Sequence, residues 1–131
     1  MQNILSIDYG TSHTGIALKL GIDNPIVPCD TINDRDQNTL IAKIIDICQN
    51  NQITDIVIGL PLNLRGEIGH QAKIVQEFGE NLQKSLPTVA IYFADERFSS
   101  KFISDQIENS DSYAAYEILD SFIKRSNHEK K

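Results

Sequence analysis

The fold of this chain is decided by the stretch ILSIDYGTSHTGIAL, residues 4–18. An apolar run leads into an acid, Asp8, and a polar turn with two glycines precedes a second apolar run. This order predicts a strand, a tight turn and an antiparallel return strand. Asp8 falls at the end of the first strand, where a packed core can hold a carboxylate rigidly at the surface. Other acids that converge on Asp8 would make this strand end a chemical site.

The length and composition indicate one globular domain covering residues 1–131. The chain lies within the common domain size of roughly 100–150 residues. Its 40% hydrophobic and 23% charged residues are ordinary for a soluble protein. The apolar runs are far shorter than the ~20 residues that span a bilayer, and no secretory signal is visible. We therefore expect a cytoplasmic protein without a membrane partner.

The net charge of −6 limits how the chain could meet nucleic acid. Proteins that coat nucleic acid non-specifically are basic, because contacts to phosphates supply most of that affinity. An acidic enzyme can still approach phosphates through bound metal and a few placed cations. The charge therefore excludes a general nucleic-acid coater and leaves a nuclease open.

After the first two strands, the hydrophobic pattern alternates between strands and helices. A short third strand is expected at residues 26–27, between turn signals. The later elements are expected as a helix at 39–49, a buried strand at 55–61, a helix at 70–85, a strand at 89–94, a helix from Ser99 or Ser100, and a last helix from about Asp111 to Phe122, followed by a polar tail. This order predicts an α/β fold with a mixed five-stranded sheet. Its first three strands are antiparallel, its later strands are parallel, and helices cover both faces.

Several acids fall at the ends of the predicted strands or at the start of a helix. Asp8 ends the first strand, and Asp111 begins the last helix. Asp95 and Glu96 follow the last strand. In an open α/β sheet, sites form at the carboxyl ends of the strands, so these acids are expected to share one rim.

Clustered carboxylates would give this rim a preference for hard cations. Carboxylates repel each other unless a cation joins them, and oxygen ligands suit Mg²⁺ or Mn²⁺. Two such ions about 4 Å apart can activate water and stabilise the leaving oxygen of a phosphodiester. The acids therefore predict metal-dependent phosphodiester hydrolysis.

Each acid also has a plainer interpretation. Asp8 could be a turn residue that bonds nearby backbone N–H groups. Asp95 and Glu96 could be solvated charges after a strand, where an ion pair contributes little stability. Asp111 stands where an N-cap belongs, and an N-cap Asp stabilises a helix by about 1 kcal/mol relative to Ala.

Four motifs, in order along the chain, resemble those of the YqgF (RuvX) family of the ribonuclease H-like superfamily. They are residues 7–11 (IDYGT) with 15–17 (GIA), 58–63 (IGLPLN) with Gly66 and Gly69, 95–99 (DERFS), and 111–115 (DSYAA) with 118–119 (IL). The resemblance covers nearly the whole chain and implies a ribonuclease H-like fold. It also implies a nuclease that acts on structured RNA, in 5′-end maturation of pre-16S ribosomal RNA. The family has also been described as a Holliday junction resolvase candidate, so branched DNA is the alternative substrate.

The resemblance also implies roles for individual residues. Asp8, Glu96 and Asp111 match the catalytic acids that hold Mg²⁺ or Mn²⁺, and Asp95 is the alternative ligand to Glu96. Asn63 and Arg97 match polar positions near the presumed site. Gly10 and Thr11, which would shape the rim, and Arg65, as a phosphate clamp beside the acids, complete the expected substrate-binding residues. One departure is the segment 105–110, which is short and carries no cation, whereas the family is usually rich in Lys and Arg there.

Three other functions remain open. Junction resolution needs a dimer, because two strands must be cut symmetrically, so we expect a monomer or a homodimer. Residues 8–12 (DYGTS) also resemble the phosphate loop of actin-like ATPases and sugar kinases, which would indicate a nucleotide-binding module. The acidic charge and the segment without cations would also suit a catalytically weak binding protein.

Overall fold

The computed structural model of the chain describes residues 2–10, 12–62, 65–95 and 110–129, and in the last helix it describes the side chains of residues 114–125. The described strands form one five-stranded sheet in the order β3-β2-β1-β4-β5. Their bounds are β1 (Asn3–Asp8), β2 (Gly15–Leu20), β3 (Val27–Pro28), β4 (Asp55–Leu60) and β5 (Ala90–Asp95). The described helices are α1 (Gln37–Asn51), α2 (His70–Ser85) and α4 (Ser110–Glu129). None of these described helices is long and apolar enough to cross a bilayer.

Strand β1 lies in the middle of the sheet, where the pairing changes direction. It pairs antiparallel with β2, with Asp8 opposite Gly15, and parallel with β4, with Ile7 opposite Ile58. Strand β5 continues the parallel part beside β4. Residues 56–58 of β4 are completely buried, as expected for a parallel strand covered on both faces. These pairings confirm the predicted mixed sheet.

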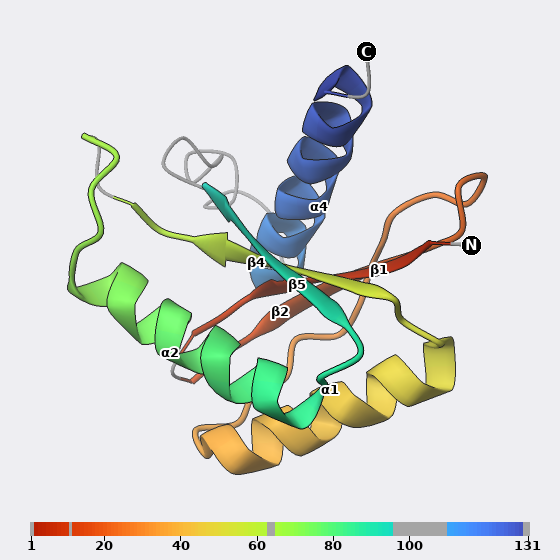
Figure 1. Cartoon of the computed structure of the whole chain (residues 1–131). Coiled ribbons are helices and arrows are strands. Elements are labelled where there is room, and N and C mark those ends of the chain that lie inside the picture. Colours follow the sequence, from red (N-terminus) through yellow and green to blue (C-terminus); the bar gives the residue numbers. More distant parts are fainter. Residues whose placement is uncertain (1, 11, 63–64, 96–109, 130–131) are drawn as a thin grey trace.

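Helices cover both faces of this sheet. Figure 1 shows α1 and α2 side by side below the sheet and α4 above it. Leu5 and Ile7 pack in one cluster with residues of α1 and α2, whereas Ile4 packs in a second cluster with Ile118 and Leu119 of α4. The alternation of β1 thus sends successive side chains to opposite layers. The helix predicted from Ser99 or Ser100 lies outside the described residues.

Strand β3 forms the edge of the sheet beside β2. It spans Val27–Pro28, one residue later than the predicted strand, and Pro28 pairs with Ala17. Proline has no N–H to donate, so within sheets it is confined to positions such as an edge strand. The N–H of Cys29 then donates to the carbonyl of Ile16 at 2.8 Å and extends the pairing beyond the strand.

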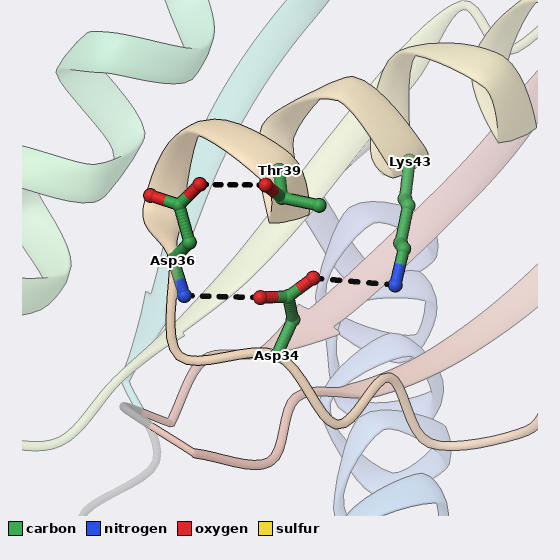
Figure 2. A network of polar contacts seen from close by, with 4 residues as sticks. All are labelled: Asp34, Asp36, Thr39 and Lys43. Carbon is green, nitrogen blue, oxygen red and sulfur yellow. Dashed lines mark hydrogen bonds and ion pairs between the residues drawn. The ribbon is translucent and has the colours of Figure 1, made fainter.

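Helix α1 begins two residues earlier than predicted, after an N-cap at Asp36. Figure 2 shows the contacts that fix this start. The Asp36 carboxylate accepts the Thr39 hydroxyl at 2.6 Å. Asp34 Oδ1 accepts the N–H of Asp36 at 3.0 Å, and Asp34 Oδ2 accepts Lys43 Nζ at 3.2 Å. The N–H of Asp36, with a further contribution from the Lys43 ammonium, holds the pKa of Asp34 below its usual value.

Replacing Asp34 with Ala should therefore lower stability in a pH-dependent way. The folded state favours the charged carboxylate, so this stabilisation is present above the unfolded pKa and is lost as the pH falls through the lower folded pKa. We expect the difference in melting temperature between wild type and Asp34→Ala to be largest near pH 7 and to shrink toward pH 3. Asp30→Ala, in the exposed loop before α1, is the control. An equal pH response of both variants would contradict the prediction.

Helix α4 approaches β1 closely through small residues. The Ser6 hydroxyl donates to the carbonyl of Ala115 at 2.6 Å. Ser6, Ala115 and Ala17, which lies opposite Ser6 on β2, are all completely buried. Small side chains leave room for the helix backbone, and the hydroxyl fixes the position of the helix over the strand.

The Ser6–Ala115 contact can be tested by Ser6→Ala. The substitution removes one buried hydrogen bond without adding bulk, so we expect the free energy of unfolding in urea to fall by about 1 kcal/mol. Ser85→Ala is the matched control, because the exposed Ser85 hydroxyl makes only a 3.5 Å contact to Asn81. That variant should stay within about 0.5 kcal/mol of wild type. Equal losses in both variants would show that the buried contact contributes nothing specific.

Candidate active site

Asp8 ends the central strand at the edge where the parallel strands also end. Its half-buried side chain follows the fully buried Ile7, and its backbone is paired with Gly15. Strand alternation places Asp8 on the same face as Ile4 and Ser6, the face that α4 covers. The strand end therefore presents this carboxylate from a rigid core, as the sequence predicted.

Helix α4 contacts β1 two residues before Asp8, at Ser6. Ala115 sits over Ser6, and the later residues Ile118 and Leu119 share a cluster with Ile4 at the start of β1. Helix α4 begins at Ser110, one residue earlier than predicted, so Asp111 lies inside its first turn and not at the N-cap position. The described side chains of this helix do not include Asp111.

Asp95 also lies at the carboxyl edge, but on the other face of the sheet. It ends β5 and pairs in register with Leu60. Leu60 packs against the cluster that contains α1 and α2, whereas Ala94, the residue before Asp95, belongs to the cluster of α4. Parallel partners point to the same side of a sheet, so Asp95 faces away from the layer that carries Asp8. Glu96 lies outside the described residues.

The turn after Asp8 closes tightly at Gly10. A Cβ atom at this position would lie 2.3 Å from the carbonyl oxygen of His13, so only glycine fits. The Thr14 hydroxyl donates to the carbonyl of Gly10 at 3.3 Å across the turn. Gly10 thus shapes the rim beside Asp8, and Thr11 lies outside the described part of the chain.

The other predicted substrate-binding residues are only partly described. Arg65 is exposed in the loop between β4 and α2, and Gly66 follows it with a φ of 80°. Asn63 and Arg97 lie outside the described residues. Within the part of the chain that the structure describes, no group of three His, Cys, Asp or Glu residues could hold a metal ion.

Two structural residues near Asp8 were absent from the sequence interpretation. Ser6 is a polar residue on a core strand, and its hydroxyl fixes α4. Tyr9 follows Asp8 and stacks on Phe78 of α2, with ring centroids 4.2 Å apart and planes inclined by 12°. A polar residue in an otherwise apolar strand was the available signal for Ser6, whereas the partner of Tyr9 lies too far along the sequence to be read from a pattern.

Comparisons with solved structures place this fold among known proteins. RuvC of Thermus thermophilus matches over 96% of this chain and 97% of its own, with a TM-score of 0.63 and 9% identity. The same protein in complex with a Holliday junction substrate matches over 91% of both chains, with a TM-score of 0.62 and 8% identity. This likeness confirms the ribonuclease H-like fold that the sequence motifs implied.

Comparisons of sequence give the family. A protein from Sulfurihydrogenibium sp. (strain YO3AOP1), named "Putative pre-16S rRNA nuclease", is 35% identical over 95% of this chain and 92% of its own. A protein of the same name from Rickettsia felis is 31% identical over 92% of this chain and 84% of its own. The family model described as "RuvX: Holliday junction resolvase" matches residues 2–125. The chain therefore belongs to the RuvX (YqgF) family.

Proposed function

We propose that this protein is a metal-dependent nuclease that hydrolyses phosphodiester bonds of structured RNA in 5′-end maturation of pre-16S ribosomal RNA. The observation that carries the proposal is the position of Asp8, at the carboxyl end of the central strand and on the face covered by α4, in a chain of this family. Relatives named as pre-16S rRNA nucleases give the substrate class. In this proposal residues 1–131 act as one domain in the cytoplasm, as a monomer or homodimer.

The contact between Ser6 and Ala115 supports pairing Asp8 with Asp111. Asp8 lies two residues beyond Ser6, which is about 7 Å along a strand. Asp111 lies four residues before Ala115, which is about 6 Å along a helix. In this proposal α4 runs back along β1 from the Ser6–Ala115 contact, so that both steps lead away from that contact in the same direction. The Ser6–Ala115 contact therefore fixes β1 and α4 to each other close to both Asp8 and Asp111.

The proposed third acid is Glu96 rather than Asp95. Asp95 faces the layer of α1 and α2, whereas Asp8 faces the layer of α4. Asp8, Glu96 and Asp111 are oxygen donors of the kind that Mg²⁺ and Mn²⁺ prefer. These residues would hold one or two such ions, which supply an activated water and stabilisation of the leaving oxygen.

The remaining residues of the site would handle the nucleic acid. Gly10 and Thr11 would shape the rim, so that the nucleic-acid backbone can approach close to Asp8. Asn63, Arg65 and Arg97 would bind phosphate oxygens, and Arg is suited to two parallel hydrogen bonds with one phosphate. A chain with a net charge of −6 needs such placed groups, because its overall field repels RNA.

Asp8→Asn tests the proposed mechanism. The wild type should cleave a precursor 16S ribosomal RNA transcript with Mg²⁺ or Mn²⁺ and lose this activity in a chelator. Asp8→Asn should lower the rate by more than about 100-fold, the upper range for weakening a metal site through its outer partners. Its melting temperature should stay near that of wild type.

Asp23→Asn, an exposed turn residue, is the control for this loss of charge and should keep full activity. Undiminished cleavage by Asp8→Asn would overturn the proposal. A wild type that binds the transcript without cutting it, under conditions in which a relative cuts, would favour the binding protein instead.

A second candidate is cleavage of branched DNA. The observation that favours it is the description of the matching family model as a Holliday junction resolvase. A four-way DNA junction offered beside the RNA transcript separates the two candidates by the rate of cleavage of each. Symmetric cutting of a junction also requires a dimer, so a strictly monomeric protein in sedimentation would argue against it.

A further inference from the structure

One short segment of the chain makes several hydrogen bonds to the turn that follows Asp8. We call residues 9–14 the rim loop and residues 32–37, which lead from β3 into α1, the clamp segment. The two are far apart in sequence, yet the described residues of the rim loop bond the clamp segment at Tyr9, His13 and Thr14. Neither segment belongs to the proposed set of metal ligands.

The first attachment holds Tyr9, the residue directly after Asp8. Its ring stacks on the fully buried Phe78 of α2. Its hydroxyl accepts Gln37 Nε2 at 3.2 Å, and Gln37 Oε1 accepts Asn81 Nδ2 of α2 at 2.8 Å. Tyr9 is thereby fixed to α1 and α2, the two helices that cover one face of the sheet.

The second attachment holds the far end of the rim loop. Thr14 and Ile32 exchange two backbone hydrogen bonds, each of 2.9 Å. His13 Nδ1 lies 2.6 Å from Asn33 Oδ1. An amide oxygen only accepts, so the imidazole donates from Nδ1 in this pair. The buried Thr14 also bonds the carbonyl of Gly10, which ties this attachment back to the residues near Asp8.

The clamp segment is itself fixed to α1. Figure 2 shows Asp34 joined to the N–H of Asp36 and to Lys43, and Asp36 joined to Thr39. The rim loop is therefore bonded to a segment that cannot shift without disturbing the start of a packed helix.

We infer that the clamp segment positions Asp8 for metal binding, with Gln37 and Asn33 as positioning residues that act through Tyr9 and His13. The sheet fixes Asp8 from the side that precedes it, and the clamp segment fixes the backbone that follows it. Partners that orient a metal ligand commonly change metal affinity or activity about 10- to 100-fold when removed. The inference rests on the proposed function, because it assigns a role within that site.

Two double-mutant cycles test this inference on the full chain. One combines Tyr9→Phe with Gln37→Ala, and the other combines His13→Ala with Asn33→Ala. Each single variant should lower kcat on the precursor RNA about 10- to 100-fold and raise the Mn²⁺ concentration for half-maximal rate, while KM stays within about twofold. The double variant should lose no more than the more affected single variant of its pair, because both changes break the same contact. Gln37→Ala also removes the acceptor of Asn81, so its loss should equal or exceed that of Tyr9→Phe.

Gln49→Ala, an exposed residue of α1, is the matched control and should behave as wild type. Losses in kcat that simply follow losses in melting temperature would overturn the inference. A loss in His13→Ala far beyond that in Asn33→Ala would also overturn it, since His13 would then contact the substrate directly.

Hydrogen exchange separates failure of the clamp from failure of the proposed function. Amides of the rim loop should exchange faster in all four single variants than in wild type and in Gln49→Ala, whether or not the protein cleaves RNA. Unchanged exchange overturns the clamp even if the nuclease is confirmed. Faster exchange in the four variants, together with a wild type that neither cleaves RNA nor binds Mn²⁺, supports the hold on the loop and overturns its catalytic purpose.

Discussion

One buried hydrogen bond, from the Ser6 hydroxyl to the carbonyl of Ala115, joins residues 109 positions apart in the chain. It sets the position of α4 over β1. The distance between Asp8 on β1 and Asp111 on α4 depends on that position. Small residues on both sides allow the close approach, so a larger side chain at Ser6 would push the helix outward. The sheet supplies Asp8, and this contact decides where the first turn of the last helix lies relative to it.

Much of the fold could be predicted because it follows from local patterns. The apolar run of β4 predicted a buried parallel strand, and the hydrophobic pattern predicted the last helix, whose Ala115, Ile118 and Leu119 are buried. The predicted end of α4 was wrong, because the helix continues to Glu129 through residues that were predicted to form a polar tail. Lys124 pairs with Asp120 at 2.9 Å, one turn earlier, and such pairs support exposed helix that has no apolar side to bury.

The site was harder to predict than the fold. Asp8 could be named because it ends a strand, but the face on which Asp95 lies depends on its register with Leu60, which no local pattern contains. The attachments of Tyr9 and His13 likewise join residues 28 and 20 positions apart. Their partners are ordinary polar residues, Gln37 at the start of α1 and Asn33 in the loop before it. Sequence patterns identify groups that can do chemistry, whereas orientation comes from contacts between distant segments.

The edge strand β3 has a consequence for assembly. An exposed edge normally invites another strand to add to the sheet, through its row of unpaired N–H and C=O groups. Here that edge has only two residues, and Pro28 has no N–H to offer. A neighbouring molecule would gain almost nothing by continuing the sheet at β3. Two copies that act together on one branched substrate would therefore have to associate through a surface other than the β3 edge.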